Sequence, residues 1–243
     1  MITKIFKIYP KKRPPLDKAL QKIFNFEYKK NRTNLLSQLS ESWLHFSIRG
    51  RKQSGTNTLE LGAGTLNHLK YEKLENKRYD VIEPKKFLYA NSKYKKKVCK
   101  FYSSIKKVPE NYYDRIISCA TLEHLEDLPY FLFISAKKMK KNGYQSHSIP
   151  CEGYPTWNFV WWFFSGIIFR LRTGFSFRHI QKYEHLNNHD EIVKLIRFFY
   201  KEYEISYSYP SYFSPYLSFY ANITFCNPNK KNIKIYQKKL KNL

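Results

Sequence analysis

Short apolar runs alternate with polar or glycine-containing turns through the middle of the chain. The first run, at 58–61, leads directly into Gly62-Ala63-Gly64, and further runs follow it. Runs this short read as buried strands, and segments with helical apolar spacing lie between them. This alternation predicts an α/β fold with a mainly parallel sheet and helices on both faces. The expected core strands are 58–61, 79–82, 115–119 and 144–149.

Apolar residues with helical spacing lie between the core strands and also on both sides of the core. They predict two N-terminal helices, a helix directly after the glycine turn and a helix across 128–139. A further helix and two strands are expected to close the sheet. The outer elements are predicted at 16–26 and 35–46 for the first two helices, 190–200 for the last helix, and 203–209 and 217–226 for the strands.

The aromatic stretch 157–169 interrupts this pattern. It is shorter than the roughly 20 apolar residues that cross a bilayer, so we interpret it as an insertion into the core. We divide the chain into an N-terminal helical segment at 1–50, a core domain at 51–228 with the aromatic insertion at about 151–183, and a basic tail at 229–243 that we expect to be frayed.

Composition and charge narrow the class of protein. With 42% hydrophobic residues, the 243-residue chain is able to bury a core that offsets its ordering entropy. The formal net charge of +25 favours an anionic partner. However, Lys, Asn, Ile, Tyr and Phe are abundant together, as an AT-rich genome would produce, so we expect no nucleic-acid partner. Four single cysteines and the lack of a signal-peptide core predict a reduced, cytoplasmic protein.

The glycine turn and two acidic residues indicate a nucleotide cofactor. Gly62 and Gly64 let backbone approach a ligand closely, but position 67 is Asn67, where a dinucleotide site favours glycine. Glu60 precedes the turn, where it would repel a pyrophosphate but receive the ammonium group of an amino-acid ligand. Glu83 ends the second strand, where a carboxylate accepts hydrogen bonds from both ribose hydroxyls. Together these residues favour S-adenosylmethionine over NAD.

Three stretches resemble successive motifs of class I S-adenosylmethionine-dependent methyltransferases, in particular the type 11-like group. They are Glu60-Leu61-Gly62-Ala63-Gly64-Thr65, Tyr79-Asp80-Val81-Ile82-Glu83-Pro84, and Tyr113-Asp114-Arg115-Ile116-Ile117-Ser118 with Leu122-Glu123-His124-Leu125. The likeness covers about 56–150 and implies a Rossmann-like fold. Leu66 departs from it, because many members have a third glycine there. The resemblance implies cofactor-binding roles for Glu60, Gly62, Ala63, Gly64, Glu83, Cys119, Ala120 and Thr121.

A narrower resemblance concerns the methyl acceptor. The stretches 62–69, 148–153 and 184–188 are similar to methyltransferases found with bacterial surface-polysaccharide genes, which implies an oxygen of a sugar or another small polar molecule as acceptor.

An oxygen acceptor usually needs a base within hydrogen-bond reach. We predict His185, flanked by Glu184, as the first candidate and Glu152 as the second. The alternatives are that His185 starts a helix and bonds to nearby backbone, and that Glu152 belongs to an ordinary turn. We expect His124 to pack structurally, and no metal site is predicted.

The aromatic insertion admits several roles. Helical spacing would gather Trp157, Trp161 and Trp162 broadly on one side. Such a face would form a lid over the acceptor, a contact with the inner surface of a membrane through 157–169, or ordinary core.

Two further function classes stay open at this point. The basic charge and abundant tyrosine also suit an RNA or other nucleic-acid methyltransferase. A noncatalytic membrane-associated or assembly protein that retains the fold is the other alternative, against which the intact set of Glu60, Gly64 and Glu83 argues.

Overall fold

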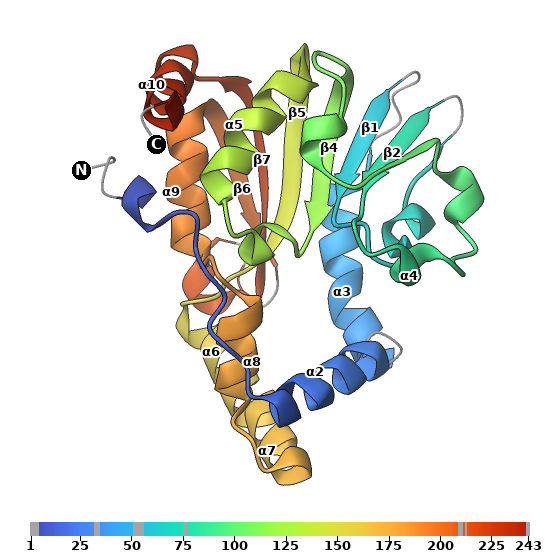
Figure 1. The fold of residues 1–243 in the computed structure, drawn as a ribbon, viewed down its shortest axis with the longest axis vertical. Coiled ribbons are helices and arrows are strands. Elements are labelled where there is room, and N and C mark those ends of the chain that lie inside the picture. The colour runs from blue at the N-terminus through green and yellow to red at the C-terminus, as the bar shows by residue number, and fades with distance from the viewer. Residues whose placement is uncertain are drawn as a thin grey trace.

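The computed structural model describes residues 5–31, 35–50, 56–74, 77–208, 211 and 213–241, with side chains described in these ranges except at 25–40, 164 and 165. Its centre is a seven-stranded sheet in the order β3-β2-β1-β4-β5-β7-β6 (Figure 1). The strands are β1 Asn57–Leu61, β2 Arg78–Ile82, β3 Lys100–Tyr102, β4 Tyr113–Cys119, β5 Met139–Pro150, β6 Tyr200–Tyr207 and β7 Tyr220–Pro228. β1 pairs in parallel with β2 and β4, β2 with β3 and β4 with β5, whereas β7 runs antiparallel to β5 and β6. The predicted α/β fold with a mainly parallel sheet is confirmed.

Helices pack against both faces of the sheet, because successive side chains on each strand point to opposite sides. The α-helices are α2 Lys18–Asn31, α3 Leu35–Ile48, α4 Lys86–Tyr89, α5 Leu128–Lys138, α6 Pro155–Val160, α7 Ile167–Thr173, α8 Phe177–Glu184, α9 His189–Phe199 and α10 Lys230–Lys241. On one face, Leu59 and Ile116 belong to a core that includes residues of α5, α9 and α10. On the other face, Val81 and Ile117 pack in a core with Ile48 of α3 and with Tyr89.

The helix that the sequence predicts directly after the glycine turn does not form. Only a short 3-10 helix, η2 Asn67–Lys70, lies there. Leu66 adopts φ 67°, a left-handed conformation that cannot continue a right-handed helix. The buried side chains of His68 and Glu72 instead turn toward Arg115 on β4. That prediction was wrong, because the backbone leaves right-handed helical geometry at Leu66 and continues only as one short 3-10 turn.

The C-terminal tail is ordered. It forms α10, in which Tyr236 is buried against Phe6 and Phe199, with ring centroids 5.2 Å apart in both contacts. The apolar spacing of one helix face therefore outweighs the lysine-rich composition. The expectation of a frayed tail was wrong for the described residues.

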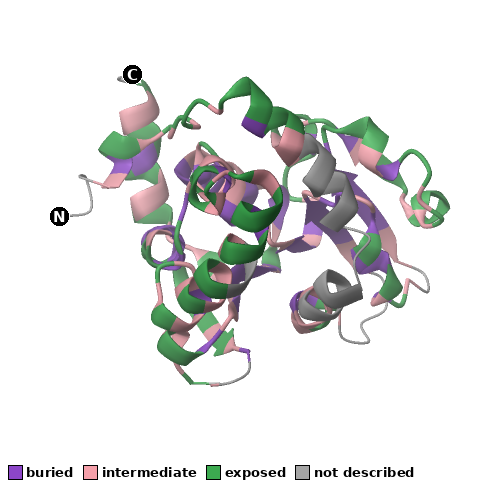
Figure 2. Ribbon diagram, turned by 90° about the horizontal axis from the view of Figure 1, so that it is seen from below, coloured by how far each residue is buried: buried purple, intermediate pink, exposed green. Residues whose placement is uncertain are grey.

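The aromatic insertion forms a helical arm, which we define as α6, the π-helical turn η6 Trp161–Gly166, α7 and α8. The arm extends from the end of the sheet that lies lowest in Figure 1. Figure 2 views the molecule from this end, with buried residues on the strands behind and mainly exposed and intermediate residues on the helices in front. Among the described residues, no helix is long and apolar enough to cross a membrane.

The three tryptophans of the arm do not share one face. Trp157 is 1% exposed and belongs to the main core, whereas Trp162 is 58% exposed. Five residues along a helix correspond to a rotation of roughly 140°, which separates these two side chains. The expectation that the three tryptophans share one face was therefore wrong. The start of the arm belongs to the buried core, whereas its outer side is exposed.

Candidate active site

The predicted site residues gather where parallel strands end. The glycine turn follows β1, Glu83 follows β2, Thr121 follows β4 and Glu152 follows β5. Because these strands are parallel, their carboxyl ends meet at one edge of the sheet, which is where open α/β sheets bind ligands. The structure thus brings the predicted cofactor-binding and acceptor-side residues to the same edge.

The glycine turn has a backbone that requires glycine. Gly62 has φ 65° and donates its N–H to Ile82 O at 2.9 Å. A Cβ atom at Gly62 would lie 2.6 Å from the side chain of Thr121, so the turn passes too close to the end of β4 for any other residue. Ala63 is buried in this turn, and Gly64 has φ 51°. The turn therefore presents backbone rather than side chains.

Glu83 is held in a fixed orientation against this turn. Its Oε2 accepts a hydrogen bond from Gly64 N at 2.9 Å, and its Oε1 accepts one from Lys85 N, also at 2.9 Å. Each carboxylate oxygen has a second lone pair for a further donor. The arrangement joins the end of β2 to the glycine turn and leaves acceptor capacity for a ligand's hydroxyl groups.

Glu60 lies beneath the turn in a buried polar layer. It is 2% exposed, and its Oε2 accepts a hydrogen bond from Tyr79 Oη at 2.8 Å. Burial raises the pKa of Glu60, while the nearby His68 and the bond from Tyr79 lower it. The predicted contact of Glu60 with an ammonium group stays a prediction.

The same layer contains a buried ion-pair network. Arg115 binds Glu72 through both guanidinium ends, at 2.5 Å from Nη2 to Oε1 and 3.3 Å from Nη1 to Oε2. His68 approaches Glu72 Oε1 at 2.7 Å, and its other ring nitrogen lies 3.3 Å from His45 Nδ1. Burial alone would raise the pKa of Glu72, but the bonds and charges of His68 and Arg115 outweigh it and lower that pKa to about 2.

The stretch after β4, which contains the predicted cofactor-binding residues Cys119, Ala120 and Thr121, borders the glycine turn. Ala120 has φ 46° and donates its N–H to Ser148 O at 2.9 Å. Thr121 Oγ1 donates to Cys119 O at 3.0 Å and lies 3.3 Å from Leu61 O. The backbone turns sharply here, which ties the end of β4 to the ends of β1 and β5.

The two predicted acceptor-side residues form one pair. His185 Nδ1 lies 2.5 Å from Glu152 Oε2, and Gln181 Nε2 donates to the other oxygen of Glu152 at 2.7 Å. Burial lowers the pKa of His185, but the bond to Glu152 and the charges of Glu123 and Glu184 outweigh it and raise that pKa. His185 stands at the end of α8, not at the start of a helix, and its ring bonds to a carboxylate. The helix-start alternative was wrong.

Glu123 and His124 complete this cluster, although the sequence predicted only structural packing for His124 and did not single out Glu123. They belong to the 3-10 helix η5 Leu122–His124, and Glu123 is 1% exposed. Burial raises the pKa of Glu123 to about 7, which His185 partly counteracts. The rings of His124 and His185 lie 5.0 Å apart. A buried acid beside two histidines is visible only once residues distant in sequence are brought together.

The N-terminal segment 9–13, which we call the strap, holds this cluster from outside. It links η5 to the chain after α8 and so fixes His185 relative to Glu123. Its side-chain bonds are Tyr9 Oη to Asn187 Oδ1 at 2.8 Å, Lys11 Nζ to Leu186 O at 2.6 Å, and Arg13 Nη2 to His124 O at 2.9 Å.

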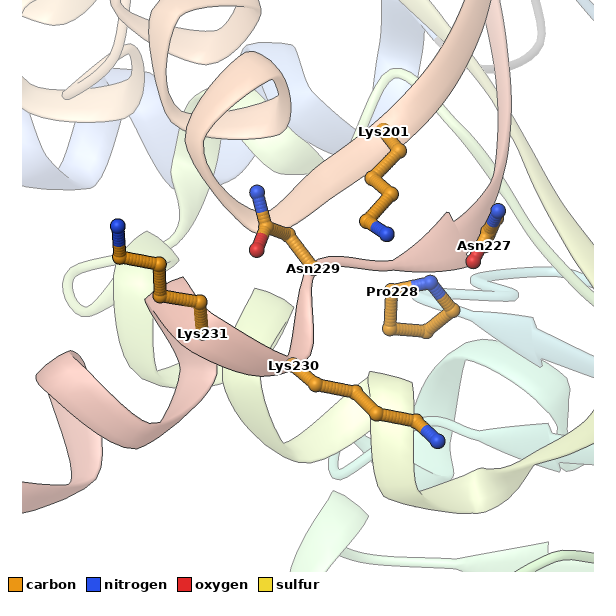
Figure 3. A pocket seen from close by; sticks show the side chains of 6 residues that line it. All are labelled: Lys201, Asn227, Pro228, Asn229, Lys230 and Lys231. Atoms are coloured by element: carbon orange, nitrogen blue, oxygen red, sulfur yellow. The ribbon is translucent and has the colours of Figure 1, made fainter.

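A surface depression formed by described residues lies away from this cluster. A depression of about 450 Å³ is formed where β6 begins and where β7 meets α10 (Figure 3). Because β6 pairs with the antiparallel β7, this is the edge opposite to the carboxyl ends of the parallel strands. It is lined by Lys201, Asn227, Pro228, Asn229, Lys230 and Lys231, and none of the predicted site residues contributes to it.

Comparison with known proteins identifies the fold. No family model and no curated protein match the chain. A solved structure described as a possible histamine N-methyltransferase from Thermotoga maritima is similar, with a TM-score of 0.54 and 16% identity over 83% of this chain and 95% of that one.

Two further solved structures extend this comparison. Phosphoethanolamine N-methyltransferase 2 of Haemonchus contortus, in complex with S-adenosyl-L-methionine, has a TM-score of 0.53 at 10% identity, covering 78% of this chain and 52% of that one. The CurJ carbon methyltransferase has a TM-score of 0.50 at 16% identity, covering 72% and 49%. The chain thus spans about half the length of these two. The sheet has the Rossmann-like fold of class I S-adenosylmethionine-dependent methyltransferases, and the predicted fold is confirmed.

Proposed function

We propose that the protein is an S-adenosylmethionine-dependent methyltransferase that acts on an oxygen of a sugar or another small polar acceptor. The observation that carries the proposal is the joined glycine turn and Glu83, with Gly64 N 2.9 Å from Glu83 Oε2 at the carboxyl ends of β1 and β2. This is the place where the fold binds nucleotides. The similar structure from Haemonchus contortus, which holds S-adenosyl-L-methionine, supports the same cofactor here.

The proposed cofactor site uses backbone and carboxylate groups. The Gly62–Gly64 turn lies against the methionine end, Glu83 accepts the ribose hydroxyls, and Cys119, Ala120 and Thr121 form the adjoining wall. Bound S-adenosylmethionine supplies a methyl carbon on a sulfonium, which keeps the electron pair of the broken C–S bond as the acceptor oxygen forms the new C–O bond. The protein's task is to align the acceptor and exclude water.

The His185–Glu152 pair supports an oxygen acceptor. A hydroxyl must lose its proton as it attacks, and a histidine held by a carboxylate at 2.5 Å is oriented for that purpose. Thr121, on the cofactor side, is two residues from Glu123 in the same turn. The acceptor would therefore lie between the cofactor wall and His185.

Cofactor binding tests the proposal. We expect wild-type protein to bind S-adenosylmethionine and S-adenosylhomocysteine in a calorimetric titration. Glu83→Ala should weaken that binding by about 1.5 to 3 kcal/mol, because charge-assisted ribose hydrogen bonds are lost. Glu110→Ala is the control, since this exposed acid pairs with Lys138 shortly before β4 begins, at the opposite end of the strands from the glycine turn, and the variant should bind like the parent. A wild-type protein that binds neither ligand would refute the function, and a folded Glu83→Ala with parental affinity would refute the ribose assignment.

We also propose that the arm contacts the surface of an anionic membrane, where a lipid-linked acceptor would be met. Exposed aromatic and aliphatic side chains gather on it with cationic neighbours, and the Arg178 guanidinium lies 5.6 Å from the Trp162 ring centroid. Apolar rings beside guanidinium groups suit the boundary between lipid chains and phosphates. The exposed apolar residues of the arm are Phe159, Trp162, Phe163, Ile167, Ile168 and Leu171, and its exposed arginines are Arg170, Arg172 and Arg178.

Vesicle flotation tests the membrane contact. Wild-type protein should float with vesicles that contain phosphatidylglycerol, and more weakly with purely zwitterionic vesicles. The double variant Trp162→Ser with Phe163→Ser should bind the anionic vesicles about tenfold less, because two exposed rings no longer enter the interface. Phe87→Ser removes an exposed ring of α4, outside the arm, and should change nothing. Equal flotation of all three proteins would count against the proposal.

A further inference from the structure

Three potential metal ligands converge beside the proposed acceptor position. One ligand atom each from Glu123, His124 and His185 lies within 4.8 Å of the others. Two of these residues are neighbours in η5, and the third follows α8. The strap described above holds the two segments together, so this convergence is built into the fold.

The Nδ1 nitrogen of each histidine is anchored to an acceptor. His185 Nδ1 faces Glu152 Oε2 at 2.5 Å, and His124 Nδ1 faces the backbone oxygen of Glu184 at 2.8 Å. An acceptor at Nδ1 places the ring proton there, which leaves the lone pair of a neutral imidazole on Nε2. Metal-binding histidines are typically oriented in this manner, by a carboxylate or backbone oxygen on the other nitrogen.

The carboxylate of Glu123 has unused acceptor capacity. Its Oε2 is fully buried and has no hydrogen-bond partner among the described residues. By contrast, the backbone oxygen of Glu123 accepts bonds from Leu186 N at 2.8 Å and Asn187 N at 3.0 Å. A buried, unpartnered carboxylate oxygen is costly unless a cation or donor occupies the position beside it.

We propose that Glu123, His124 and His185 bind a divalent transition-metal ion of the Zn²⁺ class. Two imidazole nitrogens and one carboxylate oxygen are a ligand set that such ions favour, and three protein ligands leave a coordination position open. Binding requires the donor atoms to approach by roughly 1 Å, since ligands around Zn²⁺ lie about 2.0 to 2.2 Å from the ion. His124, whose side chain is 30% exposed, is the least buried of the three residues and would make most of that movement.

The inference rests on the proposed function, because it keeps the same cofactor and acceptor, and it replaces the base role of His185 with activation of the acceptor by the bound ion. A hydroxyl oxygen bound at the open position would become more acidic, so that it would lose its proton to a solvent base as it binds, before water is excluded, and would attack as an alkoxide. In this arrangement His185 is a metal ligand, and Glu152 is a positioning residue that orients the ring of His185. The ion also fixes the acceptor oxygen relative to the cofactor wall at Thr121.

Metal titration of EDTA-treated, desalted full-length protein tests the site without any substrate. We expect one Zn²⁺ per chain by calorimetry, and Co²⁺ should give visible absorption bands of a bound ion. Glu123→Gln and His124→Ala should each weaken Zn²⁺ binding at least about 100-fold, and Glu152→Gln about 10- to 100-fold. His124→Ala alters a partly exposed side chain, so it keeps the test valid where Glu123→Gln does not fold. His179→Ala, an exposed histidine of α8, should bind Zn²⁺ like the parent.

Absence of saturable Zn²⁺ binding, or parental affinity in the folded variants of Glu123 and His124, would overturn the site. S-adenosylmethionine is titrated separately into the EDTA-treated protein. Cofactor binding without metal binding leaves the proposed function intact and removes the metal site. Metal binding without cofactor binding supports the metal site and refutes the proposed function.

Discussion

Replacing Glu72 with Gln should lower the free energy of unfolding by about 3 kcal/mol near neutral pH, and this loss should shrink as the pH falls. The pKa of Glu72 is lowered to about 2 in the folded protein, from an ordinary value near 4.5. A carboxyl group whose folded pKa is depressed adds stability that is complete above its unfolded pKa and disappears as the pH falls through its folded pKa. A shift of that size corresponds to about 3 kcal/mol.

The measurement is urea unfolding of both proteins between about pH 7 and about pH 3. The difference between wild type and Glu72→Gln should fall to less than half over this range, because the carboxylate of the unfolded chain takes up a proton while that of the folded protein stays largely ionised. Glu110→Gln is the matched control. Its exposed carboxylate lies 3.8 Å from Lys138 Nζ, so the change should stay within about 0.5 kcal/mol at every pH. A difference for Glu72→Gln that is constant or grows toward acid pH would contradict the role of the Arg115 network.

Trp157→Ala should destabilise the protein by about 3 to 5 kcal/mol, whereas Trp162→Ala should change its stability by less than about 0.5 kcal/mol. Trp157 is buried at the root of the arm, with its ring 5.3 Å from that of Trp161 and 5.8 Å from that of His185. Its removal leaves a cavity beside the acceptor-side pair. Trp162 lies on the exposed side and loses little packing.

Thermal unfolding of the two variants decides between these positions. At about 2 to 4 °C per kcal/mol for a chain of this size, Trp157→Ala should melt roughly 10 °C below the parent, and Trp162→Ala within about 2 °C. Similar melting temperatures for both variants would show that the arm does not bury Trp157. A large loss for Trp162→Ala would show that its exposed face is covered, for example by a second copy of the chain.

The local patterns of the sequence were enough to predict the sheet and to place the glycine turn and Glu83 at one of its edges. Gly62, Gly64 and Glu83 were predictable because strand ends and turns are short-range features, and parallel strands bring their ends to one edge. The missing helix after the glycine turn was not predictable, because it depends on the left-handed backbone at Leu66 and on the distant Arg115.

The cluster of Glu152, His185, Glu123 and His124 could not be predicted from local sequence patterns. His185 and Glu152 were predicted as separate candidates, and only the tertiary structure makes them one hydrogen-bonded pair. Glu123 was not among the predicted site residues, since nothing near it in the sequence reveals that His185 will lie beside it. The strap could not be predicted for the same reason, because Tyr9 and Arg13 form hydrogen bonds with residues from distant parts of the chain.

The strap also has a consequence for the order in which a ribosome completes this protein. Tyr9 and its partner Asn187 are separated by 178 positions, and Lys11 and Leu186 by 175. At about 5 to 20 residues per second, the strap leaves the ribosome roughly ten to thirty seconds before its partners exist. The glycine turn and the ends of β1, β2 and β4 are synthesised in the interval and are able to fold first. The edge around the glycine turn is therefore able to assemble early, whereas the cluster around His185 forms only when the strap meets residues that are synthesised more than 170 positions later.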